Sequence, residues 1–376
     1  MQTVWSPFQL CSYAGFALSV SIAMALISHL GLSHWVLAVL VLSSVSVHFA
    51  LLALTRLITG GDRLVFYHDL IAVMGVAAIV LWLMGQPILP YLDVAILGLG
   101  ILLAWGRLGC LMVGCCHGRP YAWGVCYSEG HTSLGFTPYF VGVRLFPIQA
   151  VESLWVAGLV LAGGISMWHR YQLGETLTWF SIAYAIGRFC FEFMRGDAVR
   201  PYLGGFSEAQ WSSLILTCVI ALGELSGIVQ FQLLHIAATA GLIVVMLAVA
   251  VARQFRKTAR HLLLHPRHVD EVARAVEWLA DPATTTISAK RAPIKIGTTS
   301  LGIQISASTI KQGESSIYHY SLSSQTGTIS EEAVRAIARL ILQLKHPSGA
   351  TELTKGNRGV FHVLIYPWKD GRYTWN

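Results

Sequence analysis

Charged residues are scarce in this sequence. Asp, Glu, Lys and Arg together make up 12% of its 376 residues, and 55% are hydrophobic. An ordinary soluble domain carries about twice that charged fraction, so the composition excludes a chain that is soluble throughout and indicates a multi-span membrane protein with a more polar tail. The formal net charge is +7, but no nucleic-acid-binding motif accompanies it. Basic residues outside the apolar runs fit anionic lipid head groups, so we expect a membrane as partner and no nucleic acid.

Two further features are missing. The first apolar stretch has neither a basic flank nor a cleavage site, so we expect no removable signal peptide. Cys115, Cys116 and His117 are adjacent, which is awkward for chelating one ion, and no second Cys/His pair stands at zinc spacing. We therefore expect no metal and no other cofactor. Two interpretations stay open for Cys110, Cys115, Cys116 and Cys126: packing thiols, or a disulfide if their side of the membrane is oxidising.

Long apolar runs, in contrast, recur along the first 255 residues. A spanning helix needs about 20 mostly apolar residues, and eight runs approach that length. The seventh is the weakest because Glu224 interrupts it, so the sequence predicts an all-α polytopic bundle of seven or eight transmembrane helices. The candidate spans lie near 9–29, 36–58, 68–85, 92–113, 148–168, 176–194, 211–228 and 235–252.

The composition changes after the last span, which predicts a transmembrane domain over 1–255 and a soluble α/β accessory domain over 256–376. Ser330 is placed to N-cap a helix, because an apolar stripe follows it at helical spacing. His319 and His362 fall in expected strands, where we interpret them as packing residues. The tail contains no catalytic motif. Its expected elements are an amphipathic helix over 266–280, strands over 293–310 and 315–323, the helix after Ser330 and a closing strand over 359–366.

Charged side chains inside the apolar part mark the candidate site. Tyr184, Arg188, Glu192 and Arg195 follow one another at spacings of four, four and three residues, which places them on one helix face. Charges in a membrane helix are costly unless they face protein or water. Two interpretations are open: an Arg188–Glu192 pair that only ties helices together, or a phosphate clamp in which the planar guanidinium groups bind phosphate oxygens.

Three other segments carry polar groups at the ends of spans. The stretch 105–127 places Arg107, His117 and Arg119 where a membrane helix should end, and Glu152 lies one turn inside the fifth span. A buried Glu152 needs a cationic partner, and we expect an arginine. The sequence Tyr67-His68-Asp69 opens the third span. There His68 is either a general base that Asp69 orients or a solvated residue in an interfacial aromatic belt.

In this order, the segments resemble the bacterial prolipoprotein diacylglyceryl transferase family. The resemblance covers roughly residues 10–225, and the tail lies outside it. It rests on GRLG at 106–109 with GR at 118–119, PIQAVE at 147–152, YAIGRFCFEFMRGD at 184–197 and SEAQWS at 207–212.

The resemblance implies a bacterial inner-membrane enzyme that moves the diacylglyceryl group of phosphatidylglycerol to the lipobox cysteine thiol of a preprolipoprotein. The family's two essential arginines fall on Arg107 and Arg188, and its catalytic His falls on Tyr67, beside His68. We accordingly expect catalytic roles for Arg107, Arg188, His68 and Tyr67. The expected substrate-binding residues are Tyr184, Glu192, Arg195, Arg119, His117, Gln149 and Glu152.

Departures from the family pattern keep a second function open. Tyr67 stands at the His position, Cys110 replaces the Asn of the first signature, and Val113-Gly114-Cys115 replaces Asn-Gly-Glu. These changes suit a non-catalytic phospholipid-binding scaffold whose tail recruits a partner. With eight spans, the tail would share the site's side of the membrane. Arg253, Arg256, Lys257 and Arg260 then favour a cytoplasmic site, whereas the resembled family works on the outer face. With seven spans, the tail would be cytoplasmic and the site periplasmic, as in the family.

Overall fold

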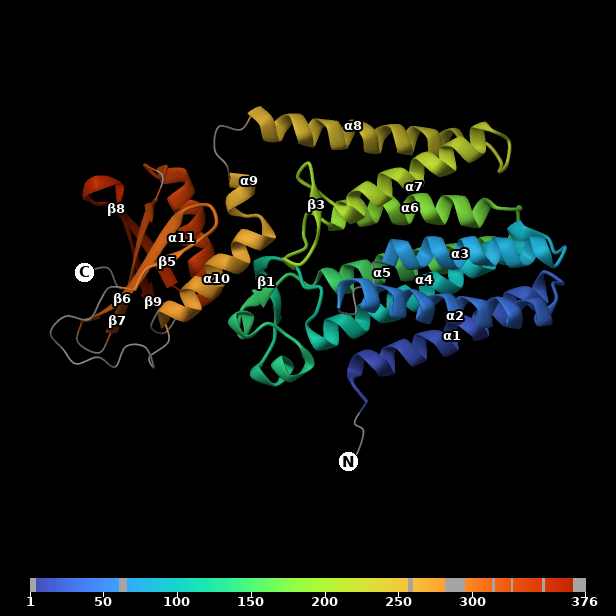
Figure 1. The fold of residues 1–376 in the computed structure, drawn as a ribbon, viewed down its shortest axis with the longest axis horizontal. Helices are drawn as coiled ribbons and strands as arrows, with labels where there is room; N and C mark the ends of the chain where they lie inside the picture. Colours follow the sequence, from blue (N-terminus) through green and yellow to red (C-terminus); the bar gives the residue numbers. More distant parts are fainter. Residues whose placement is uncertain are drawn as a thin grey trace. The chain divides into compact units, whose positions relative to one another are not determined.

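The computed structural model describes residues 5–60, 66–255, 260–280, 295–312, 315–325, 327–346 and 349–367. The chain divides into two compact units (Figure 1). The first unit contains Met1–Val113, Ile148–Phe193 and Arg200–Ala250. The second unit contains Gly114–Pro147, Met194–Val199 and Val251–Asn376.

Long apolar helices build the first unit. Among the described residues, five helices are long and apolar enough to cross a membrane, namely α1, α2, α4, α5 and α8, and Tyr67–Leu83 forms a shorter apolar one. This confirms a helix-rich membrane architecture, while the total of seven or eight spans stays a prediction. The helices are α1 (Pro7–His29), α2 (His34–Thr59), α3 (Phe66–Leu83), α4 (Ile88–Val113), α5 (Ile148–His169), α6 (Glu175–Phe191), α7 (Glu208–Leu225) and α8 (Leu233–Phe255).

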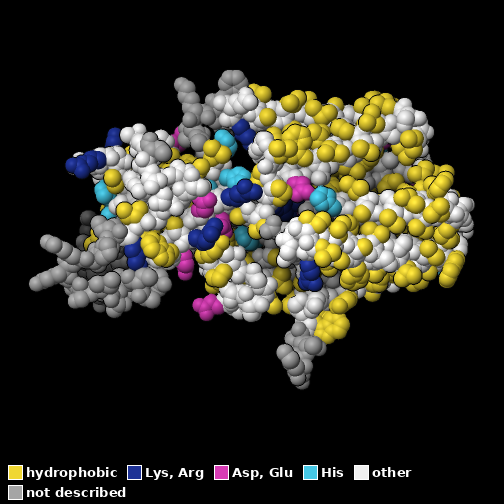
Figure 2. All heavy atoms as spheres, in the orientation of Figure 1, with side chains coloured by type: hydrophobic (Ala, Val, Ile, Leu, Met, Phe, Trp, Pro, Cys, Tyr) yellow, Lys and Arg dark blue, Asp and Glu magenta, His cyan; other side chains and the backbone are white. Residues whose placement is uncertain are grey.

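Helix α4 is the packing centre of the first unit, and it contacts α1, α3, α5 and α6. Its glycines permit close approach: a Cβ on Gly100 would lie 2.7 Å from side-chain atoms of both Phe180 and Val160. Most of the other spans keep an apolar face outward, with Leu57 84% exposed and Leu154 74% exposed. Figure 2 shows hydrophobic side chains over the helices of this unit. An outward apolar surface of this extent suits a lipid environment.

Capping explains where two of these helices begin. The Ser6 hydroxyl accepts from the backbone N–H of Gln9, and the Gln9 side chain accepts from the Ser6 N–H. Ser207 and Gln210 repeat this capping box at the start of α7. Each box satisfies two of the N–H groups that a helix start leaves without an intrahelical acceptor. Two short strands, β3 (Tyr202–Leu203) and β4 (Phe206–Ser207), lead into α7.

The second unit is an α/β fold. An antiparallel sheet in the order β5-β6-β7-β9-β8 packs one face against α10 and α11. Ser330 caps α11 by accepting from the Ala333 N–H, which confirms the predicted start of that helix. The elements are α9 (Arg260–Leu263), α10 (Pro266–Ala280), β5 (Gly297–Thr298), β6 (Ile303–Gln312), β7 (Ser315–Ser324), α11 (Glu331–Lys345), β8 (Gly349–Lys355), η4 (Asn357–Gly359) and β9 (Phe361–Pro367).

The long loop between α4 and α5 belongs to this second unit, although the sequence analysis placed it in the transmembrane domain. It forms β1 (Pro120–Cys126), η1 (Glu129–Leu134), η2 (Pro138–Phe140) and β2 (Arg144–Leu145). Its side chains Tyr127, Phe136, Phe140, Val143 and Leu145 share one hydrophobic core with α10, α11 and the sheet. Tyr139 also donates a 2.5 Å hydrogen bond to Asp270 of α10. The loop and the tail therefore fold as one body.

The sequence predicted most tail elements and missed two details. The helix over 266–280 is confirmed. The expected strand over 293–310 is instead split by a turn at 299–302 into β5 and β6, and residues 293–294 lie outside the described part. Strand β8 was not foreseen, because its sequence GATELTK has no aromatic residue, Val or Ile, and only two threonines favour a strand.

Candidate functional site

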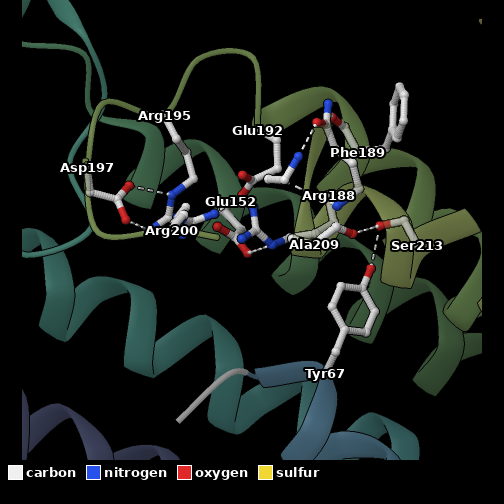
Figure 3. A network of polar contacts seen from close by, with 12 residues as sticks. Tyr67, Glu152, Arg188, Phe189, Glu192, Arg195, Asp197, Arg200, Ala209 and Ser213 are labelled. Carbon is white, nitrogen blue, oxygen red and sulfur yellow. Dashed lines mark hydrogen bonds and ion pairs between the residues drawn. The ribbon is translucent and has the colours of Figure 1, made fainter. Parts of the chain in front are cut away.

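An ion-paired cluster occupies the interior of the first unit (Figure 3). Arg107 of α4 contacts Glu152 of α5, with 3.0 Å between Nε and Oε2. Glu152 also contacts Arg188 of α6, with 3.6 Å between Oε1 and Nε. Arg188 in turn lies 2.5 Å from Glu192, at the end of α6, and Glu192 contacts Arg200. The order is cation, anion, cation, anion, cation.

The interior members of this chain of ion pairs are the most deeply buried. The side chains of Glu152 and Glu192 are 0% and 1% exposed, and that of Arg188 is 6% exposed. Arg107 and Arg200, at the two ends, are 11% and 18% exposed. Both ends are therefore cationic and more accessible than the middle. Buried charges of this kind are costly, and in a membrane protein they suggest a function.

The sequence analysis anticipated much of this arrangement. Glu152 has arginine partners as expected, and it joins Arg107 to Arg188. Gln149, one turn before Glu152 in α5, is 1% exposed. Arg200 was missed, because it lies in the loop after α6, where a helical spacing from Glu192 has no meaning. A single arginine before Pro201 gives no local signal, and only the return of that loop places it beside the carboxylate.

Tyr67 lies inside the first unit next to the cluster, where the resemblance places the family's His. It is 1% exposed, and its ring centroid lies 5.9 Å from that of Tyr184. The Ser213 hydroxyl donates to the Ala209 carbonyl at 2.8 Å, so it accepts from the Tyr67 hydroxyl at 2.7 Å (Figure 3). This hydrogen bond fixes the orientation of the Tyr67 side chain.

His68 points elsewhere. Its side chain is 59% exposed, and Nε2 lies 2.9 Å from Oε1 of Glu208 at the start of α7. Asp69 instead contacts His48 at 3.1 Å, so the expectation that Asp69 orients His68 is wrong. Successive residues of a helix diverge by about 100°, so neighbours in sequence do not face each other. Any orienting carboxylate for His68 is Glu208.

Arg195, His117 and Arg119 belong to the second unit. Arg195 was expected on the same face of α6 as Tyr184, but α6 ends at Phe191, so that expectation is wrong. Arg195 instead pairs with Asp197, with 3.0 Å between Nε and Oδ1. Arg119 donates from Nε to the Arg195 carbonyl at 3.2 Å. His117 is buried, and its Nδ1 donates to the Gly118 carbonyl at 2.9 Å.

Two glycines explain why these second-unit segments can meet. Gly118 pairs with Arg195 in an isolated β-bridge. A Cβ on Gly196 would lie 2.3 Å from the Gly118 carbonyl oxygen, and one on Gly118 would lie 2.3 Å from the Phe146 carbonyl oxygen. Neither carbonyl group can move far enough to accommodate a Cβ atom, so any larger residue at Gly118 or Gly196 would push the segments apart.

Polytopic helices around a net-cationic cluster define a membrane protein whose site suits an anionic ligand. Guanidinium groups bind phosphate oxygens with planar, paired donors, and the arginine and carboxylate groups of this cluster do not resemble a metal centre.

Comparison with known proteins agrees with this class. The family model for prolipoprotein diacylglyceryl transferase matches residues 10–224, and the chain belongs to that family. The phosphatidylglycerol–prolipoprotein diacylglyceryl transferase 2 of Clostridium perfringens is 31% identical over 132 residues, which are 34% of this chain and 48% of the relative.

The transferase of Clostridium tetani is 29% identical over 132 residues, 34% of this chain and 49% of the relative. The transferase of Streptococcus agalactiae serotype Ia is 30% identical over 142 residues, which are 35% of this chain and 50% of the relative. The chain thus spans about half the length of the curated relatives it matches. No solved structure matches it significantly.

Proposed function

We propose that the protein transfers the diacylglyceryl group of phosphatidylglycerol, or of a closely related glycerolipid, to a cysteine thiol, in the plasma membrane of a bacterium. The acceptor is the lipobox cysteine of a preprolipoprotein. The observation that carries this proposal is the buried cluster with its two cationic ends, Arg107 and Arg200. Family membership and the names of the relatives supply the reaction.

In this mechanism the cluster binds the lipid phosphate. Glu152 pairs with Arg107 and Arg188, and Glu192 pairs with Arg200. The guanidinium groups of these three arginines donate to the phosphate oxygens. Their counter-charges are fixed before substrate arrives, so little reorganisation is needed when charge develops on the leaving group. The Tyr67 hydroxyl, beside the cluster, is a further donor after it rotates away from Ser213.

The chemical step is a substitution at the glyceryl carbon. The acceptor sulfur forms a bond to that carbon while the carbon–oxygen bond to the phosphate breaks. Glycerol phosphate leaves as an anion that the arginines stabilise, and the thiol proton passes to a base. Because the thiolate is the reactive form, a base near the acceptor accelerates attack.

For the base we propose His68, with Glu208 as its orienting carboxylate. The 2.9 Å contact between them supports this assignment, since a carboxylate that accepts from one imidazole nitrogen fixes the tautomer and the orientation of the ring. As the alternative base we propose His117 of the second unit. Roles of Arg119, Arg195, Gln149 and Tyr184 in substrate binding also remain proposals.

We further propose eight spans, with the tail on the same side of the membrane as the loop between α4 and α5. Segments 114–147, 194–199 and 251–376 form one compact unit, so they share one side. Between the first and second of these lie α5 and α6, and between the second and third lie α7 and α8. In this proposal each pair crosses the membrane and returns, which makes α7 a span despite Glu224.

A reconstitution assay tests the function. Protein purified in detergent is given phosphatidylglycerol labelled in its acyl chains and a lipobox peptide, and peptide-bound label is measured. We expect transfer by the wild type, loss in Arg107→Ala and Arg188→Ala, and poor rescue by Arg188→Lys because the planar fork is lost. No transfer by folded wild type, with lipid binding retained, would instead support a scaffold.

That scaffold is the second candidate function. It is favoured by one observation: where the family has its His, the side chain beside the cluster is Tyr67, and His68 is largely exposed. A lipid-binding protein needs the arginines but no base. The same assay separates the two functions, because only the transferase releases glycerol phosphate.

A further inference from the structure

Two histidines of the second unit meet on one face of its sheet. His319 lies in β7 and His362 in the neighbouring antiparallel strand β9. The register pairs Ser321 with His362 and His319 with Leu364, so the two histidines are diagonal neighbours on the same face. The sequence analysis interpreted both as packing residues. The buried apolar side chains of these strands lie on the opposite face, toward α10 and α11.

The two imidazole rings are arranged with nitrogen facing nitrogen. Nε2 of His319 lies 2.9 Å from Nδ1 of His362, and the ring planes are inclined by only 29°. Two imidazole donors on a zinc ion, each at about 2.0–2.1 Å with a tetrahedral angle, lie about 3.3 Å apart. A small opening of the side chains therefore admits one ion between these nitrogens.

The surroundings orient the His319 ring and leave room beside the His362 ring. Ser308, directly opposite His319 in β6, places its hydroxyl 3.0 Å from His319 Nδ1. With the Nδ1 proton donated to that oxygen, His319 Nε2 carries the lone pair. On the other ring, a Cβ at Gly356 would lie 2.6 Å from His362 Nε2, so the glycine leaves room for that nitrogen. An outer hydrogen bond of this kind orients metal-ligating histidines.

We propose that His319 and His362 form a binding site for a late first-row divalent cation, such as Zn²⁺ or Ni²⁺, with water in the remaining positions. Imidazole nitrogen suits these ions. The site is independent of the proposed transferase reaction.

Zinc titration by calorimetry tests this site. Full-length protein in detergent is stripped with a chelator, and its cysteines are alkylated so that thiols do not bind the metal. We expect one Zn²⁺ per chain to be lost in His319→Ala and in His362→Ala, and retained in His261→Ala, an exposed histidine of the same unit. Ser308→Ala should keep the site but weaken binding by about 10-fold, because the outer hydrogen bond is removed.

A matched check guards against misfolding. His319→Asn keeps a polar side chain that can still reach Ser308, and its far-UV circular dichroism should equal that of the wild type while the Zn²⁺ is lost. If His319→Ala, His362→Ala and His319→Asn all bind as many Zn²⁺ ions as His261→Ala, with equal affinity, the ion is held elsewhere and the proposal is wrong.

Discussion

Replacing Glu152 by Gln should destabilise the protein strongly. The substitution keeps the shape of the side chain but removes its charge. Glu152 is 0% exposed and lies 3.0 Å from Arg107 and 3.6 Å from Arg188. Removing one partner of a buried ion pair costs about 3–5 kcal/mol, because the other charge stays buried without compensation. Here two guanidinium groups lose the same counter-charge, so we expect the upper part of that range.

The apparent melting temperature in detergent measures this effect. For a unit of 150–250 residues, about 1 kcal/mol corresponds to 2–4 °C. A loss of about 4–5 kcal/mol should therefore lower the melting temperature of Glu152→Gln by at least about 8 °C. The matched control is Glu331→Gln, which removes an exposed partner of Arg335 in α11 and should change the free energy of unfolding by about 0.5 kcal/mol or less.

A double variant makes the reasoning refutable. Arg107→Gln together with Glu152→Gln removes both members of one pair and leaves Arg188 its other partner, Glu192. Its melting temperature should therefore lie above that of Glu152→Gln alone. If Glu152→Gln melts within 1 °C of the Glu331→Gln control, the cluster does not stabilise the first unit in the way described.

The remaining predictions concern Arg200 and pH. Arg200→Ala should lower the transfer rate about 10- to 100-fold, as expected for losing a charge-assisted hydrogen bond, and Arg200→Lys should recover part of that rate. The control is Arg170→Ala, which removes an exposed arginine. Equal transfer rates in the two alanine variants would exclude Arg200 from the site. Burial, and secondarily Lys345, lowers the pKa of His346 from 6.5 to about 4. Because the folded state then binds fewer protons than the unfolded chain, the second unit should lose stability as the pH falls from about 6.5 toward 4. In His346→Asn the melting temperature should depend less on pH over this range. An unchanged slope of melting temperature against pH would contradict this prediction.

The sequence alone determined which segments become helices and which of their residues carry charge. Spans such as 36–58 are predominantly apolar over the length that a membrane requires, so their helices follow from local chemistry. A buried Glu152 must have a cation whatever the fold, which is why its arginine partner was predictable. Ser330 and the acidic turn after it specified the start of α11 in the same local way.

Only the tertiary structure decided which distant residues meet. Arg200 reaches Glu192 because the loop after α6 turns back, and no spacing in the sequence encodes that turn. The end of α6 at Phe191 removed Arg195 from the helix face that its spacing had suggested. His319 and His362 lie 43 residues apart and come within 2.9 Å through strand pairing. Likewise, the 114–147 loop joins the tail because its aromatic side chains complete the core over α10 and α11. Contacts of this kind depend on the packing of whole surfaces, which local sequence patterns do not record.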